Sequence, residues 1–126
     1  MKKIIPYLFI LPALWILTLS PAQASDSNIS SMAGIVMHLK HYPNGNEKAQ
    51  LAAIVSDHQT TAGEKALASA LKNMQHKVSG SDANALQQLQ SDPSASQQER
   101  ELATILLGIA HAPSTQDKNK LKALMQ

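Results

Sequence analysis

The chain repeats its own sequence every 35 residues without a gap, and this repeat limits the possible folds more than any other feature. His41, His76 and His111 occupy the same position in the three copies. Apolar and acidic residues also recur in aligned columns: Met32, Leu67 and Leu102; Val36, Leu71 and Leu106; Leu51, Leu86 and Leu121; Glu47, Asp82 and Asp117. A fixed period of this size is typical of proteins built from small units that bury their apolar faces against one another.

Each copy has the pattern of two helices. In its first half the apolar residues lie at helical spacing, as at 32, 35, 36 and 39. A Ser, Thr or Asn followed three residues later by an acid marks the predicted helix starts. These pairs are Asn44/Glu47, Thr61/Glu64, Ser79/Asp82, Ser96/Glu99 and Ser114/Asp117. The predicted helices lie near 27–41, 45–57, 62–77, 80–91, 97–111 and 115–125.

Together these helices predict an all-α domain over 25–126, made of three tandem helix-turn-helix repeats at 26–60, 61–95 and 96–126. The repeats fit either a short α-solenoid or a compact bundle of the six helices. In length and two-helix plan the unit resembles the tetratricopeptide repeat of about 34 residues. The resemblance is architectural only, because the Trp, Tyr and Phe columns of that repeat are absent here.

Residues 1–24 have the three parts of a secretory signal peptide. A lysine pair is followed by an apolar run over 4–19, and small residues stand at Ala22 and Ala24. We expect cleavage after Ala24, which would place the domain in the periplasm or outside the cell. Because the chain has no cysteine to carry a bacterial lipid anchor, we expect no stable membrane anchor after cleavage.

The composition of the remaining domain argues against several functions. Its basic and acidic residues are equal in number, and Tyr42 is its only Phe, Trp or Tyr, so nucleic acid is not an expected partner. It has no thiol nucleophile, glycine-rich phosphate loop or G-x-S-x-G motif, so we expect no enzymatic activity. We predict a module that binds another protein, with Tyr42, His38 and His58 as candidate contact residues, and with no cofactor.

The histidines support an alternative function. His41, His76 and His111 are predicted at helix C-termini, where an imidazole can bond the last free carbonyls, so the column is interpreted as structural. Met37, His38 and His41 would lie on one side of the predicted helix 27–41. Imidazole and thioether suit copper, and imidazole also suits zinc. The alternative is therefore a copper- or zinc-binding protein. One metal could reach all three histidines of the column only in a closed bundle.

Overall fold

The computed structural model describes residues 22–126, with side chains from Ser27 onward. The predicted signal peptide over 1–24 lies almost wholly outside the described residues. Six helices make up the described chain: α1 (Ala22–Met37), α2 (Gly45–Ser56), α3 (Ala62–Asn73), α4 (Gly80–Gln90), α5 (Gln97–Gly108) and α6 (Thr115–Leu124). The predicted all-α class and the two-helix repeats are confirmed.

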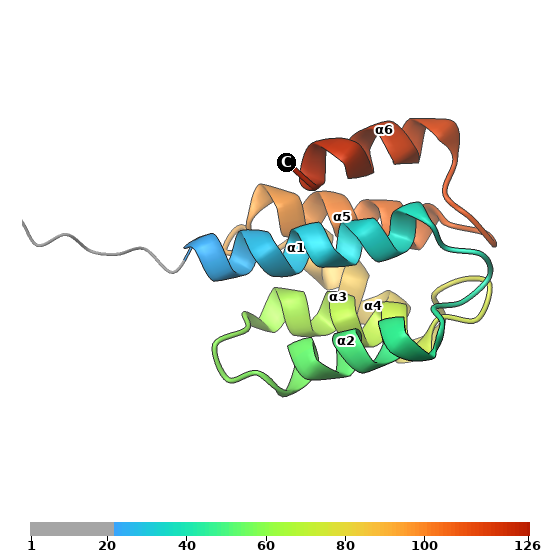
Figure 1. Ribbon diagram of the computed structural model, residues 1–126. Helices are drawn as coiled ribbons and strands as arrows, with labels where there is room; N and C mark the ends of the chain where they lie inside the picture. Colours follow the sequence, from blue (N-terminus) through green and yellow to red (C-terminus); the bar gives the residue numbers. More distant parts are fainter. Residues whose placement is uncertain (1–21) are drawn as a thin grey trace, which may run out of the picture.

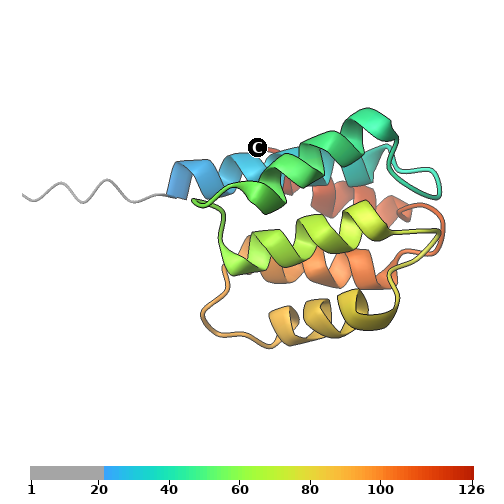
Figure 2. The same ribbon diagram turned by 90° about the horizontal axis from the view of Figure 1, so that it is seen from below.

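The helices form a closed ring, which decides between the two predicted arrangements. Helices α1, α3 and α5 contact one another in the centre, and α2, α4 and α6 lie outside them (Figures 1 and 2). Each outer helix packs mainly against the central helix of the following repeat: α2 on α3, and α4 on α5. Helix α6 returns to α1, and this contact closes the three repeats into a compact bundle.

The core is built from the repeat columns. Among the described residues, every buried Leu, Ile, Val, Met or Ala except Ile29 belongs to a column that is buried in all three copies. In the first copy these columns begin at Met32, Ala33, Ile35, Val36, Leu39, Leu51 and Ile54. The three copies therefore bury equivalent residues, as a ring of equivalent units requires. The column of Ile29 differs, because it continues as the buried carboxylates Glu64 and Glu99.

The first helix of each repeat ends three or four residues before its predicted boundary. Helices α1, α3 and α5 end at Met37, Asn73 and Gly108, and not at 41, 77 and 111. The C-cap residues Met74 and Ile109 are already extended, with ψ of 130°. The predicted boundaries were wrong because Leu39, Met74 and Ile109 remain buried, so the apolar spacing continues beyond the helical backbone.

Four of the five predicted capping pairs form as expected. The side chains of Asn44, Thr61, Ser96 and Ser114 each accept a hydrogen bond from the backbone N–H three residues later. Ser79 makes no such bond. Its φ of −144° departs from the −66° to −72° of the other caps, and Gly80 after it has a positive φ of 62°. The start of α4 therefore has a different backbone from the equivalent starts of α2 and α6.

Helix α1 begins at Ala22, so the predicted cleavage site at Ala24 falls within its first turn. The side chains of residues 22–26 are not described, and the structure does not test the site. Over residues 22–126, no helix is both long enough and apolar enough to cross a membrane.

Candidate metal centre

The three histidines of the repeat column meet at one end of the bundle. They lie in the connectors 38–44, 74–79 and 109–114, which join the two helices of each repeat and all turn at that end (Figure 1). The Nδ1 atoms are 3.1 Å apart for His41 and His76, 3.2 Å for His41 and His111, and 3.0 Å for His76 and His111. Ring closure thus brings three imidazole nitrogens, one from each repeat, around a single point. We call this group the histidine triad.

Each triad residue stands at the centre of a tight turn. The backbone N–H of the following residue donates to the carbonyl of the preceding one: Tyr42 to Lys40, Lys77 to Gln75, and Ala112 to Ala110, at 2.7–3.0 Å. The central histidines have φ of 71°, 66° and 76°. This geometry is a γ-turn of the positive-φ type, which is rare and strained. Histidine is one of the few residue types besides glycine that is enriched at positive φ.

Backbone hydrogen bonds also join the three turns into a ring. The N–H of His41 donates to the carbonyl of His111, that of His76 to His41, and that of His111 to His76, at 2.7–2.8 Å. Each histidine therefore donates once and accepts once. Nδ1 is the ring nitrogen nearer the backbone, so a tight ring of backbone bonds places these nitrogens close together. The backbone of three repeats positions the triad, which a single helix cannot do.

The described contacts of these rings differ from those of a helix cap. The rings lie edge to face, with centroids 4.9–5.2 Å apart and planes inclined at 69–79°. Their Nδ1 atoms point toward one another, whereas a capping imidazole would reach the last carbonyls of its own helix. All three side chains are exposed at the surface. The column is structural through its backbone, and its side chains form a separate polar cluster.

Hydrogen bonding alone cannot satisfy this cluster. In a neutral imidazole, Nδ1 is either a donor or an acceptor. Among three mutually adjacent atoms, at least two must then be of the same kind, so either two N–H groups or two lone pairs face each other at about 3 Å. A cation bound by all three lone pairs removes this conflict. It leaves the Nε2–H groups free to donate elsewhere.

The spacing of the nitrogens suits one transition-metal ion. A metal about 2.05 Å from each nitrogen, the usual zinc–imidazole distance, would lie about 1.0 Å from the plane of the three nitrogens. Its N–metal–N angles would then be about 98°, between those of an octahedron and a tetrahedron. Three ligands on one face leave the opposite positions open. This is the arrangement of a metal site that can take an additional ligand.

The structure does not hold the predicted set Met37, His38 and His41 together on one helix. Helix α1 ends at Met37, so the helical spacing on which that prediction depended is absent. Met37 is half-buried and packs against the core. The Nδ1 of His38 lies 3.1 Å from the carbonyl of Gly34, one turn back along α1. Of the predicted set, only His41 belongs to the triad.

Two other candidate contact residues lie at opposite ends of the molecule. Tyr42 is 57 % exposed and follows the triad residue His41, with the Lys48 ammonium 5.6 Å from its ring centroid. His58 is exposed in the loop between α2 and α3, away from the triad (Figure 1). The structure therefore does not bring the predicted contacts Tyr42, His38 and His58 into one site.

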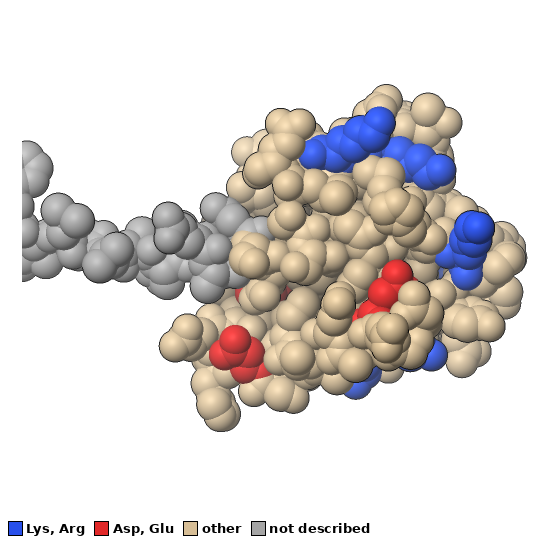
Figure 3. All heavy atoms as spheres, viewed as in Figure 1, with Lys and Arg blue, Asp and Glu red and all other residues tan. Residues whose placement is uncertain are grey.

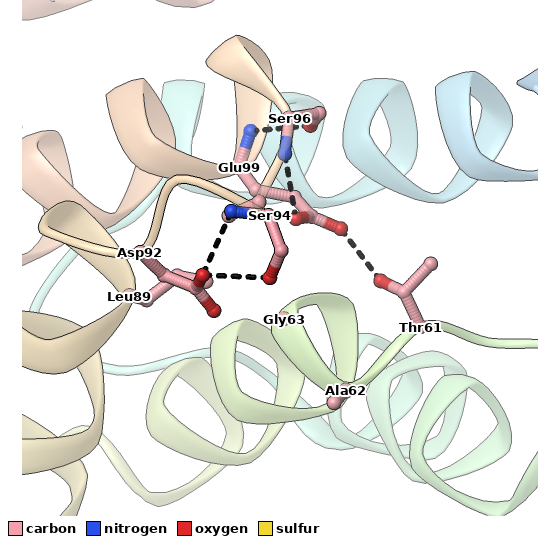
Figure 4. Close-up of a pocket in the computed structure, with 9 residues that line it drawn as sticks. Thr61, Ala62, Gly63, Leu89, Asp92, Ser94, Ser96 and Glu99 are labelled. Carbon is pink, nitrogen blue, oxygen red and sulfur yellow. Dashed lines mark hydrogen bonds between the residues drawn. The ribbon is translucent and has the colours of Figure 1, made fainter.

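The opposite end of the bundle holds a polar network that is structural in character. Glu99 is 4 % exposed, and its carboxylate accepts hydrogen bonds from Thr61 Oγ1 at 2.6 Å and from the Ser96 N–H at 3.1 Å (Figure 4). Glu64 accepts from Asn28 Nδ2 at 3.0 Å. Both acids were predicted as helix caps, but the bonds to a preceding repeat were not. These bonds account for the burial of the two carboxylates.

No family model, curated protein or solved structure matches this chain. Its function must therefore be inferred from the geometry of its sites. The histidine triad is the only cluster of potential metal-ligating His, Cys, Asp or Glu side chains found within residues 22–126. The repeat column predicted that these residues are equivalent, and only ring closure made them neighbours.

Proposed function

We propose that the chain is an exported metal-binding protein whose centre is formed by His41, His76 and His111. The observation that carries this proposal is the set of Nδ1 distances, 3.0–3.2 Å for every pair. Three nitrogens at these distances cannot all be paired by hydrogen bonds in neutral rings, and they match three ligands on one face of a metal ion.

The residue type at these turns supports a role for the side chains. Glycine adopts positive φ without strain and is the usual residue where a backbone needs that conformation. A non-glycine residue at left-handed φ costs about 1 kcal/mol. Histidine nevertheless stands at this position in all three copies, with φ of 66–76°. A purely structural turn would gain from glycine, so three histidines indicate that the imidazoles are needed.

The ligands indicate the class of metal. Three imidazoles suit divalent zinc, copper or nickel. The Met37 thioether, which would favour cuprous copper, packs against the core. We therefore propose a divalent transition-metal ion. The predicted signal peptide supports a periplasmic or secreted location, where the protein would meet such ions as it folds.

Isothermal titration calorimetry of the mature chain tests this proposal. Zn(II), Cu(II) and Ni(II) are titrated separately into protein stripped with a chelator. We expect one ion per chain for at least one metal, with a dissociation constant below micromolar. The variant His76→Gly should weaken binding at least 100-fold, and the controls His38→Ala and His58→Ala should bind as the wild type does. If no ion binds tighter than micromolar, or His76→Gly binds as well as the wild type, the proposal is wrong.

A second candidate function is binding of another protein without catalysis. It is supported by the exposure of Tyr42, since tyrosine is enriched at protein interfaces. If this face binds a partner, Tyr42→Ala should weaken the complex, and His58→Ala at the opposite end should not. A partner whose affinity is unchanged by Tyr42→Ala would bind elsewhere.

A further inference from the structure

The three histidines of the proposed metal centre leave some positions of the metal open. The connectors 38–44, 74–79 and 109–114 contain no Asp or Glu. The nearest acids along the chain are Glu47, Asp82 and Asp117, in the first turns of α2, α4 and α6. Any carboxylate ligand from the protein would have to come from one of these three residues.

All three carboxylates are engaged in other bonds. Glu47 accepts from the N–H of Asn44 at 2.7 Å, and Asp117 accepts from the N–H of Ser114 at 3.0 Å. Asp82 accepts from Asn73 Nδ2 at 3.2 Å. Moving Glu47 or Asp117 to a metal would break a capping box, which stabilises its helix. The open positions are therefore left to a ligand from solution.

The residues that flank the triad favour a negatively charged ligand. Lys40 directly precedes His41, and Lys77 directly follows His76; both side chains are exposed. A divalent ion held by three neutral imidazoles keeps its full positive charge, to which these lysines add. In Figure 3 basic side chains are visible over α6, at the connector end and along the lower edge of the molecule, and the visible acids form separate groups.

The flanking residues also differ between the repeats, which gives the site a direction of approach. The position before the histidine is Lys40, Gln75 or Ala110, and the position after it is Tyr42, Lys77 or Ala112. Only the third repeat has alanine on both sides. A groove of about 560 Å³ borders this side, lined by Lys40, Ala112 and Lys118 and also by Glu47, whose carboxylate is held in the capping box of α2. Ala112 and the ammonium groups of Lys40 and Lys118 therefore lie at one groove, where the two positive charges outnumber the single carboxylate of Glu47.

We infer that the metal centre binds a small anion with oxygen donors, a carboxylate or an oxyanion, over the alanine side of the third repeat. The anion displaces water from an open position of the metal, and Lys40 and Lys118, which line the groove, stabilise its charge. This inference rests on the proposed metal site. It adds a ligand class that the triad alone does not specify.

The test uses Co(II) as the metal, because its visible absorption bands change when its ligands change. The Co(II)-loaded mature chain is titrated with sodium acetate and, separately, with inorganic phosphate, at constant ionic strength set by perchlorate. We expect a saturable change in the bands with at least one of the two anions. Acetate represents the carboxylate source and phosphate the oxyanion source, so their relative affinities identify the preferred donor.

Two variants and one control test whether the anion binds at the assigned position. Lys40→Gln combined with Lys118→Gln should weaken anion binding about threefold to tenfold, as expected for two exposed charges, without weakening Co(II) binding. Lys122→Gln, in the last turn of α6, serves as the matched control and should change neither affinity. Ala112→Glu supplies a carboxylate from the open sector, so it should tighten Co(II) binding and abolish the response to added anions.

The possible failures can be told apart. If Co(II) binds but neither anion changes its spectrum, the anion site is wrong and the metal site stands. If the double lysine variant responds as the wild type does, or no differently from Lys122→Gln, the assigned ligand position is wrong. If neither Co(II) nor the ions used in calorimetry bind to the triad, both proposals are wrong.

Discussion

His41 and His111, seventy residues apart in the chain, are joined by backbone and side chain together. The N–H of His41 donates to the carbonyl of His111 at 2.8 Å, and their Nδ1 atoms are 3.2 Å apart. The backbone bond closes the ring between the first and third repeats. The side-chain contact forms only as a result of that closure. Changes to the triad should therefore separate the role of the turn from that of the imidazole.

Replacing His76 by glycine should make that separation. Glycine relieves the strain of a φ of 66° and keeps the backbone N–H that donates to His41, so the metal-free variant should be at least as stable as the wild type. His76→Ala retains the strain and should be less stable than His76→Gly by about 1 kcal/mol. Urea denaturation in the presence of a chelator measures both. A clearly destabilised glycine variant would show that the imidazole itself holds the turn together.

Metal should stabilise the folded chain, because the triad exists only when the ring is closed. With free metal at 100 times the dissociation constant, the free energy of unfolding should rise by about 2.7 kcal/mol. For a domain of this size the melting temperature should then rise by roughly 10–20 °C. Thermal denaturation with metal and with excess chelator measures the difference. His76→Gly should show a difference of no more than a few degrees, because binding weakened 100-fold adds only about 0.4 kcal/mol at the same metal concentration.

Gly63→Ala should destabilise the protein through a steric conflict. A Cβ at Gly63 would lie 2.7 Å from Glu99 Oε2 and 3.0 Å from Leu89 Cδ1. The Glu99 carboxylate is held by Ser96 and Thr61, so it cannot move away without losing hydrogen bonds (Figure 4). We expect a loss of about 1–3 kcal/mol in the free energy of unfolding.

Gly108→Ala is the control for this substitution. Gly108 also lies in a helix, and a Cβ there would meet no atom within 4 Å. Alanine favours the helix by up to about 1 kcal/mol, so this variant should be unchanged or more stable. Equal effects of the two substitutions would contradict the steric explanation.

The two serines before α4 and α6 should respond differently to removal of their hydroxyls. Ser114 caps α6 by accepting from the Asp117 N–H, so Ser114→Ala should cost about 1 kcal/mol. Ser79 makes no cap hydrogen bond with its side chain, and Ser79→Ala should cost much less. Chemical denaturation of the two variants compares them directly. A similar loss in both would mean that Ser79 caps α4 after all.

Asp92 should titrate below its ordinary range. The Ser94 hydroxyl and the Ser94 N–H both donate to its carboxylate, at 2.6 and 2.8 Å, and these bonds lower the pKa of Asp92 from its ordinary value of 3.8. A lowered pKa means that the carboxylate stabilises the fold above pH 3.8, and that this stability is lost as the pH falls through the lowered value. Ser94→Ala should raise the pKa of Asp92 but not restore it fully, because the N–H remains. NMR titration of the Asp92 carboxyl carbon measures the shift.

Much of the fold was predictable from the sequence because it depends on local patterns repeated three times. The spacing at Met32, Ile35 and Val36 predicts a helix face, and Asn44 with Glu47 predicts a helix start. Ring closure was not predictable in this way. Closure depends on the contact of α6 with α1. The same apolar columns would also be buried in an open stack of repeats, so they do not distinguish the two arrangements.

The histidine triad was less predictable than the fold, for two physical reasons. The γ-turns have positive φ at three histidines, and each lies two residues after an apolar residue that continues the helical spacing. Because Leu39, Met74 and Ile109 keep that spacing outside the helical backbone, the pattern extends the predicted helices too far. The convergence of the three rings is a property of the closed ring and not of any one repeat. The equivalence of the histidines was visible in the sequence, but their proximity was not.

The contact of α6 with α1 also affects how the chain acquires its structure. Part of the first helix is covered only by the last, so that part stays uncovered until the whole domain has been synthesised. A polypeptide truncated before α6 would leave Leu121 and Leu124 missing from that face. The third repeat is thus needed to finish the first, and the domain cannot mature one unit at a time.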